Sequence, residues 1–422
     1  MLAMSFYRLS LLALLTSLLT LGLSGCEDLF GSKDDPTVNE VLNEGAVDPT
    51  LIPQDVGYVP VFPVWDYFSR PRDVFVGYDE MVYVVDDNGL NVLDQTGTLY
   101  QTIPFEGAVE VTQNRRLVTY VTGRVDTAVA VRGDTQVYRL PAIYALRFAS
   151  TPDYEYLDTL VHPFDDGTRY TQSRILQPVR PDDLEVAFHG IDITAEGEIY
   201  VARTGPNNDP TASFAPDNAI LFYDRNRQFR GIGTNMSPTQ GNLRSVVGVT
   251  GLATFAGPPQ RQVGMDNSPD FVYCQATQEG PVDYRVLWIR EVFDEAAAQT
   301  NYLPNQDLLA QDTTQGDRFL YEVNRFRNPR DVYIAPDEPG YIYVVDAGLD
   351  SVFVFNQSGV EGVNPPPTAN TNKQAKVSFG GTGSGPSQFN DPSGVCYNRG
   401  TIYIADKGNN RVIRYRLNTD LE

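Results

Sequence analysis

Two stretches near the C-terminus decide the fold: Gly383-Ser-Gly-Pro-Ser-Gln-Phe-Asn-Asp-Pro-Ser-Gly-Val-Cys396 and Thr401-Ile-Tyr-Ile-Ala-Asp-Lys-Gly-Asn-Asn-Arg-Val-Ile-Arg-Tyr415. Their apolar runs are short and rich in β-branched and aromatic residues, as is typical of strands. Glycine, proline, asparagine and aspartate separate the runs, as is typical of tight turns. Together the two stretches predict three β-strands joined by short connections.

The same frame returns along the chain, which makes internal repetition the main feature of the sequence. Two clear copies share the words Pro-Arg-Asp-Val and Tyr-Val-Val-Asp, and a fourth carries Arg203 where the others carry aspartate. Two further copies are degenerate. The five additional copies span Pro71–Leu93, Gly107–Val121, Gly190–Tyr223, Gly251–Trp288 and Pro329–Phe355.

The C-terminal unit resembles the NHL repeat over nearly its whole length, and this resemblance implies the blade of a β-propeller. A blade must stack on neighbours to bury both faces, and six copies therefore predict an all-β, six-bladed propeller. The last copy stops after its third strand, while Val56 to Trp65 is an extended run that belongs to no copy. We expect this run to pair beside the C-terminal strand and to close the ring.

Long connections separate several of the strands. We expect the Gly359 to Asn372 segment, with its three consecutive prolines, to be disordered. The other expected insertions span 122–139, 151–185, 205–218, 257–269 and 293–318.

The N-terminus has the composition of an export signal. One positive charge, at Arg8, precedes the leucine-rich stretch Leu9–Leu23, which is short for a membrane span. The sequence Leu23-Ser-Gly-Cys26 resembles the lipobox of bacterial lipoproteins, in which the cysteine thiol receives the lipid. We therefore predict a signal peptide at 1–25, a lipid on Cys26 with an acidic tether over 26–54, and the propeller over 55–422.

The tether contains Ser32-Lys-Asp-Asp35, which is similar to the acidic signal that sends some Gram-negative lipoproteins to the cell surface. A solvated acidic linker is the alternative interpretation. We expect the protein at the cell envelope, on the outer membrane, and favour the surface over the periplasmic face.

Charge excludes some partners. The chain carries a formal net charge of −22, and loss of Arg8 with the signal peptide would make it −23. An acidic surface repels nucleic acid and anionic lipid. Besides Cys26 there are only Cys274 and Cys396, which we predict to be buried free thiols in different blades.

Aligned copies place one residue of each blade just before its innermost strand, around one mouth of the central channel. Two of the six are arginines, which suggests a site for an anionic group. In the alternative interpretation the mouth is merely polar, and the arginines pair with Asp73, Asp331 and Glu106. The six residues are Arg72, Glu106, His189, Thr250, Arg330 and Ser393; we predict Arg72, Glu106, His189 and Arg330 as the ligand contacts.

Three aspartates end the second strand of a blade: Asp86, Asp346 and Asp406. In NHL repeats such side chains hydrogen-bond the following turn, and we expect a structural role for them. Arg203 breaks the pattern, which suggests a local contact with the 205–218 segment.

Two classes of propeller enzyme deserve comparison with the sequence. Zinc-dependent NHL lyases use several histidines, whereas this chain has only His162 and His189. Calcium-dependent lactonase-like propellers need a channel cluster of carboxylates and amides, for which Glu106, Asp192 and Asn398 are conceivable. We identify no catalytic residue or cofactor, leaving calcium open, and expect a binding or scaffolding module for a protein, peptide or glycan; a calcium-dependent hydrolase or lactonase is the alternative.

Overall fold

The computed structural model describes residues 56–150, 153–169, 179–209, 215–240, 242–257, 268–276, 284–337, 340–367 and 369–420. These residues belong to one unit of the chain, Asp48–Glu422. The predicted signal peptide, Cys26 and the whole tether lie outside the described residues. None of the helices within the described ranges is long and apolar enough to cross a membrane.

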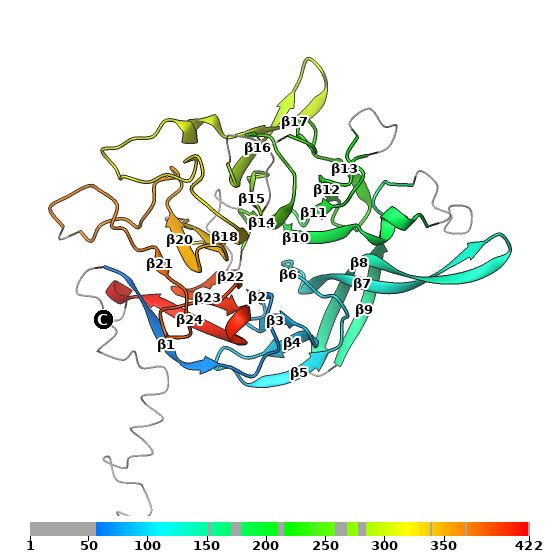
Figure 1. The fold of residues 1–422 in the computed structure, drawn as a ribbon, viewed down its shortest axis with the longest axis horizontal. Helices are drawn as coiled ribbons and strands as arrows, with labels where there is room; N and C mark the ends of the chain where they lie inside the picture. The colour runs from blue at the N-terminus through cyan, green and yellow to red at the C-terminus, as the bar shows by residue number, and fades with distance from the viewer. Residues whose placement is uncertain are drawn as a thin grey trace, which may run out of the picture. The chain divides into compact units, whose positions relative to one another are not determined.

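Six antiparallel four-stranded sheets surround a central axis, which confirms the six-bladed propeller (Figure 1). The first strand of each blade lies innermost and contacts the inner strands of the neighbouring blades. Blade 1 contains β2 (Asp73–Val76), β3 (Val82–Asp86), β4 (Gly89–Leu93) and β5 (Leu99–Ile103); blade 2 contains β6 (Val111–Gln113), β7 (Val118–Val131), β8 (Asp134–Ser150) and β9 (Asp153–Val161); blade 3 contains β10 (Ala187–Ile193), β11 (Ile199–Thr204), β12 (Ala219–Tyr223) and β13 (Phe229–Ile232).

The second half of the ring follows the same plan, except that the last blade takes its outer strand from the start of the propeller. The helices of the described residues are short 3₁₀ turns, among them η2 (Pro181–Leu184), η3 (Gln306–Leu309), η4 (Lys407–Asn409) and η5 (Asn418–Asp420). Blade 4 contains β14 (Val249–Thr254), β15 (Phe271–Gln275), β16 (Val286–Asp294) and β17 (Gln299–Pro304); blade 5 contains β18 (Pro329–Ile334), β19 (Ile342–Asp346), β20 (Ser351–Phe355) and β21 (Phe379–Gly380); blade 6 contains β22 (Pro392–Asn398), β23 (Thr401–Asp406), β24 (Arg411–Leu417) and β1 (Tyr58–Trp65).

The second strands of the blades are apolar on both faces because a neighbouring blade covers each face. All five residues of β3 and all five of β19 are buried. Burial of each large apolar side chain stabilises the fold by about 1.5–3 kcal/mol, so the hydrophobic core lies between the sheets. Cys274 in blade 4 and Cys396 in blade 6 are buried free thiols within this core.

The ring closes as predicted, through pairing of the first strand with the last. β1 is antiparallel to β24, with Tyr58 opposite Leu417 and Pro60 opposite Tyr415, and becomes the outer strand of blade 6. Its prolines are tolerated because an outermost strand needs hydrogen bonds on one side only. The backbone N–H of Asn418 donates to Gly57 O at 2.9 Å, which extends the closure.

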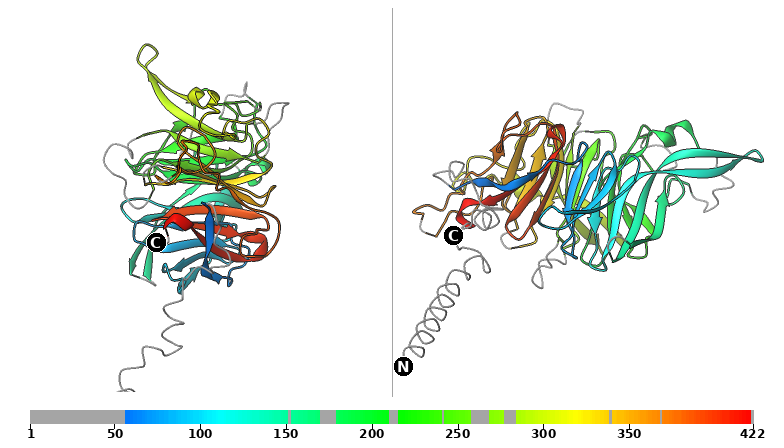
Figure 2. Two further views of the ribbon diagram at one scale, coloured as in Figure 1. Left: turned by 90° about the vertical axis from the view of Figure 1, so that its left-hand side faces the viewer. Right: turned by 90° about the horizontal axis from the view of Figure 1, so that it is seen from below.

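Several expected insertions are in fact strands. The 122–139 segment belongs to the long β7–β8 hairpin, which projects beyond the neighbouring blades at the rim (Figures 1 and 2). Its strands are joined at Arg132 and Gly133, both with positive φ, as in a two-residue hairpin turn. The 151–185 segment contains β9, and the 293–318 segment contains β17.

The prediction of disorder for Gly359 to Asn372 is wrong for most of that segment. Val360 and Val363 are buried, and Val363 pairs with Ala375 in an isolated antiparallel bridge. Glu361, also buried, binds the Arg325 guanidinium. The segment packs against blade 5 because its two valines are buried there. The three consecutive prolines had pointed to disorder, and the prediction overlooked these apolar residues.

Candidate functional site: the mouth of the central channel

The starts of the inner strands converge on one mouth of the channel. They line a cavity of about 200 Å³, together with Lys407 of η4. Five of the six residues chosen from the aligned copies lie here: Arg72, His189, Thr250, Arg330 and Ser393. Repeat alignment therefore brings together side chains that are far apart in sequence.

Glu106 is the exception, and its assignment to the mouth is wrong. Its side chain is 72% exposed and pairs with Arg139 of the β7–β8 hairpin at 2.5 Å. Val109 and Glu110 line the cavity in its place. The alignment was displaced by three residues because Gly107 was matched to the acid or glycine that begins the other inner strands. The pair Glu110-Val111, which repeats Asp73-Val74, was the available signal.

Two of the cations at the mouth are neutralised by neighbours. The Arg72 guanidinium donates to Asp87 at 2.6 Å and to Ala108 O at 2.6 Å. Lys407 Nζ lies 2.5 Å from Asp391 Oδ2. Ion pairs within the protein therefore largely neutralise the charges of Arg72 and Lys407.

Arg330 is different. Within the described part of the chain, its half-buried guanidinium takes part in no hydrogen bond or ion pair. His189 shares the cavity and likewise has no hydrogen-bond partner among the described residues. Burial and the positive charge of Arg330 lower the pKa of His189 to about 4, so its imidazole is neutral at neutral pH. The mouth therefore offers one unpaired cation beside a neutral polar ring.

Four carboxylates, three of them buried and Asp192 partly exposed, lie on or next to the inner strands, where a cavity of about 20 Å³ leaves room for about one water molecule. Three of them bridge their own blade to the next through a backbone N–H. Asp73 accepts from Val111 N at 2.9 Å, Glu110 from Ile191 N at 2.9 Å, and Asp331 from Val395 N at 2.8 Å.

The fourth carboxylate, Asp192 of blade 3, binds both neighbouring blades. It accepts from Thr112 Oγ1 at 3.0 Å and from the backbone N–H of Thr254 at 2.7 Å. We call these four side chains the channel carboxylates: Asp73, Glu110, Asp192 and Asp331.

The remaining blade junctions use a hydroxyl group and a glycine. Thr250 Oγ1 donates to Pro329 O at 2.8 Å between blades 4 and 5, and Ser393 Oγ donates to Pro71 O at 3.0 Å between blades 6 and 1. Gly251 and Gly394 allow close backbone approach here, because an added Cβ would lie 2.7 Å from Asp331 Cα or 2.6 Å from Asp73 Cα, respectively.

The channel carboxylates have raised pKa values. Burial raises the pKa of Asp73 to about 7 and that of Asp192 to about 6, against the backbone hydrogen bonds that lower it. Burial, reinforced by the neighbouring acids, raises the pKa of Glu110 and of Asp331 well above the ordinary range. No cationic side chain lines this inner cavity among the described residues. The cluster therefore holds protons at neutral pH.

The residues do not fit the calcium site considered from the sequence. Glu106 lies on the surface, whereas the Asp192 oxygens already accept four N–H or O–H donors. Throughout the described ranges, no group of three or more His, Cys, Asp or Glu side chains is arranged to hold a metal ion. The arrangement at the mouth is better suited to holding an anion.

The aspartates at the ends of second strands have the predicted structural role. Asp86 accepts from the backbone N–H groups of Asn88 and Ser69, at 2.8 and 2.9 Å. Asp346 and Asp406 likewise bind both the following turn and the loop before the inner strand.

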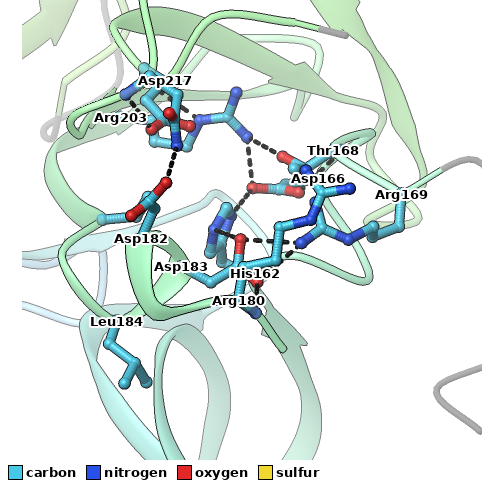
Figure 3. A network of polar contacts seen from close by, with 12 residues as sticks. His162, Asp166, Thr168, Arg169, Arg180, Asp182, Asp183, Leu184, Arg203 and Asp217 are labelled. Atoms are coloured by element: carbon cyan, nitrogen blue, oxygen red, sulfur yellow. Dashed lines mark hydrogen bonds and ion pairs between the residues drawn. The ribbon is translucent and has the colours of Figure 1, made fainter. Parts of the chain in front are cut away.

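A second buried polar cluster lies at the rim, between blades 2 and 3 (Figure 3). Arg203 occupies the position of these aspartates and donates to Pro216 O at 2.8 Å, which confirms its contact with the 205–218 segment. It also donates to Asp166 at 2.5 Å, and Asp166 lies 2.6 Å from His162 Nδ1. We call this the rim cluster: His162, Asp166, Arg169, Asp183 and Arg203.

Cations set the charge state of the rim cluster. Burial alone would raise the pKa of Asp166, but Arg203 and His162 hold it far below the ordinary range. Burial would lower the pKa of His162, but Asp166 raises it. Arg169 binds both oxygens of Asp183, at 2.8 and 3.0 Å. Sequence reasoning missed this cluster because its members come from connections that share no repeat frame.

Two larger cavities lie away from the channel. One of about 570 Å³ borders the rim cluster, and its Arg227 pairs with Asp158 at 2.9 Å. The other, of about 530 Å³, lies between blades 3 and 4, where Phe222 and Tyr302 stack with ring centroids 4.5 Å apart. In both, the groups named here are already engaged with one another.

The family described as the NHL repeat matches residues 389–415 of the chain, a stretch that runs through blade 6. No curated protein matches the sequence. The resemblance noted in the repeat is therefore supported for the copy in which it is clearest.

Solved structures resemble the chain weakly. An auxiliary nutrient binding protein from Bacteroides thetaiotaomicron shares 12% identity over 83% of this chain and 69% of its own, with a TM-score of 0.47. Virginiamycin B lyase from Staphylococcus aureus shares 10% over 86% and 99%, with a TM-score of 0.42. The PQQ-bound aldose sugar dehydrogenase from Streptomyces coelicolor shares 12% over 86% and 99%, with a TM-score of 0.46.

Similarity at this level carries no argument about function, since propellers serve binding proteins and enzymes alike. An NHL propeller is compatible with a binding or scaffolding role, which must be argued from the site itself. The chain is a six-bladed β-propeller whose last blade carries an NHL repeat.

Proposed function

We propose that this protein is a binding module of the cell envelope whose channel mouth takes an anionic group of a protein, peptide or glycan partner. A lipid on Cys26 holds it to a membrane, with residues 1–25 as signal peptide and 26–54 as tether. The outer membrane is the proposed location, with the propeller on the cell surface.

One observation carries the proposal: the guanidinium of Arg330, which has no partner among the described residues, lies at a concave site. A half-buried cation normally gains a carboxylate partner, and the chain has 54 acidic residues to supply one. Instead Arg330 faces a cavity beside neutral His189. A guanidinium and neutral polar groups around one cavity match the donors that carboxylate or phosphate groups need.

The size of the cavity limits what enters it. About 200 Å³ is less than the ~300–1,000 Å³ of sites that enclose drug-sized ligands. One acidic residue, a peptide C-terminus or one acidic sugar ring is therefore the proposed occupant, while the rest of the partner lies on the propeller face.

Calorimetric titration of the full mature protein in detergent tests the site. The probes are N-acetylglycylalanine and glucuronate, with N-acetylglycylalanine amide and glucose as uncharged counterparts. We expect at least one acid to bind and its counterpart to fail; the dipeptide and the sugar acid then distinguish a peptide from a glycan source.

Arg330→Gln removes the charge while keeping much of the length of the side chain. Since a hydrogen bond to a charged group contributes about 1.5–3 kcal/mol, affinity should fall about 10- to 100-fold. Arg318→Gln is the matched control, because Arg318 lies outside the cavity and pairs with Glu322. Failure of both acids to bind wild type, or equal affinity of both variants, would contradict the proposal.

The anchor has its own test. Palmitate labelling of cells should mark the wild type and not Cys26→Ser, and protease added to intact cells should degrade a surface-displayed propeller. A labelled protein that resists protease until the outer membrane is opened would place it on the periplasmic face.

A further inference from the structure

Glu110 lies between the two cavities of the channel. It lines the mouth cavity with Arg330 and also the inner cavity with the other channel carboxylates. Its Oε2 accepts the backbone N–H of Ile191, and Oε1 has no hydrogen-bond partner among the described residues. Of the four channel carboxylates, Glu110 is the one that also lines the mouth cavity.

Glu110 has acidic neighbours on the side of the inner cavity and cationic neighbours on the side of the mouth cavity. On the acidic side the inner strands present three aspartates, and Cys274 of β15 lies close enough for the charges to interact. On the mouth side lie the cations Arg72, Lys407 and Arg330, and among the described residues Arg330 has no ion-pair partner. The charged and titratable groups that face Glu110 are Asp73, Asp192, Cys274, Asp331, Arg72, His189, Arg330 and Lys407.

An ionised Glu110 would repel an anion at the mouth, whereas a protonated one can donate a hydrogen bond to it. Burial raises the pKa of Glu110 well above the ordinary range, and Asp331 and Asp73 raise it further. The free protein thus already favours the form that can donate.

We propose that Glu110 carries a proton which it donates in a hydrogen bond to the bound anion, so that anion and proton occupy the site together. This inference rests on the proposed function, because it specifies how the mouth recognises its ligand. At a pH where the free carboxyl is ionised, solvent supplies the proton on binding and receives it again when the anion leaves; the carboxyl O–H bond is the only bond formed or broken.

The direction of the pH effect separates Glu110 from His189. Affinity should fall as rising pH ionises Glu110, by up to about tenfold per pH unit as proton uptake approaches one per anion. His189, with a pKa of about 4, would instead strengthen binding only in acid.

Calorimetry with the acid probe that binds, in two buffers of different ionisation enthalpy at pH 6 and pH 9, measures this uptake. Glu110→Gln keeps an acceptor for Ile191 N–H and an amide donor for the anion but cannot ionise. It should abolish both the alkaline fall and the proton uptake. Glu106→Gln makes the same chemical change outside the cavity, and this variant should retain the alkaline fall in affinity and the proton uptake.

Infrared spectra give a readout that needs no ligand. A protonated carboxyl band should be present at neutral pH, weaken in Glu110→Gln and persist in Glu106→Gln, with circular dichroism confirming that each variant is folded. Binding by wild type without an alkaline fall, or a fall that survives Glu110→Gln, overturns this inference and leaves the anion site standing. Absence of any binding overturns the proposed function as well.

Discussion

The channel carboxylates and the rim cluster are both buried, yet they satisfy their charges in opposite ways. In the channel, no cation among the described residues lines the inner cavity with the four acids, and backbone N–H groups, hydroxyls and protons satisfy them. At the rim, two aspartates face two arginines and a histidine. Buried charge is costly unless it is paired or neutralised, and this molecule uses both solutions.

The difference follows from topology. Asp73, Glu110 and Asp331 occupy the same position in blades 1, 2 and 5, and Asp192 lies two residues further along the inner strand of blade 3, so acids from four blades meet around the axis. Rim residues come from unrelated connections, so opposite charges can be combined there. The symmetric site therefore gains sensitivity to pH, while the asymmetric one gains fixed charge pairs.

The largest expected effect comes from breaking the rim pairing. Asp166→Asn keeps the shape but leaves Arg203 buried without its counter-charge, which should cost about 3–5 kcal/mol. Glu110→Gln, the corresponding change in the channel, should alter stability by less than about 1 kcal/mol, because the acid is already neutral. Urea unfolding at pH 7 measures both; equal losses would show that the two clusters do not differ.

A smaller effect is expected from crowding the channel junctions. Gly251→Ala would place Cβ 2.7 Å from Asp331 Cα, and such overpacking typically costs about 1–3 kcal/mol. Gly123→Ala is the milder control, because its nearest neighbour would be 3.3 Å away. If thermal unfolding shows no difference between the two variants, close contact between blades 4 and 5 is not important for stability.

Raising the pH should lower the stability contributed by the channel carboxylates, whereas lowering the pH should reduce the stability contributed by the aspartates of the rim cluster. Asp73 and Asp192 have folded pKa values of about 7 and 6, above their unfolded values, so their contribution is full below about pH 4 and is lost as pH rises through 6–7. The slope is at most about 1.4 kcal/mol per pH unit for each proton released. His162 acts in the same direction, because its pKa is also raised.

The lowered pKa values of Asp166 and Asp183 have the opposite sign: their contribution is present above about pH 4 and is lost as pH falls further. Urea midpoints from pH 3 to pH 9 should therefore decline at both ends. Glu110→Gln should reduce the decline of the urea midpoint at alkaline pH, and Glu106→Gln should not. An alkaline decline that is identical in both variants would argue against protons stored in the channel.

The smallest expected effect is loss of a single junction hydroxyl. Ser393→Ala removes the hydrogen bond to Pro71 O between blades 6 and 1, which should cost about 0.5–1.5 kcal/mol. Anion affinity should remain within about threefold, since Arg330 and Glu110 are untouched. A much larger loss of stability would mean that this junction limits the closure of the whole ring.

Repetition explains how much of the fold the sequence could predict. Six copies of one frame predict six blades, and the orphan strand before the first copy predicts the pairing of β1 with β24. The same frame located Arg72, His189 and Arg330 at the mouth. It does not locate the residue of blade 2, because that copy is degenerate and carries Gly107 three residues before the acid–valine pair Glu110-Val111.

The rest could not be read from the repeat. The β7–β8 hairpin was mistaken for an insertion, although Val125, Thr127, Val129 and Val131 alternate as a strand should. The rim cluster joins His162, Asp166 and Arg203 across connections whose spacing carries no periodic signal. The shifted pKa values of the carboxyl and imidazole groups depend on how deeply these groups are buried. The sequence indicates such burial only at positions that recur in the repeats.

A crystal structure of wild type grown with the tightest-binding acid probe tests the central claim most directly. We expect the anion within hydrogen-bond distance of the Arg330 guanidinium, with Glu110 as its second contact inside the mouth cavity. An anion bound at the rim, or at the mouth without contact to Arg330, would contradict it.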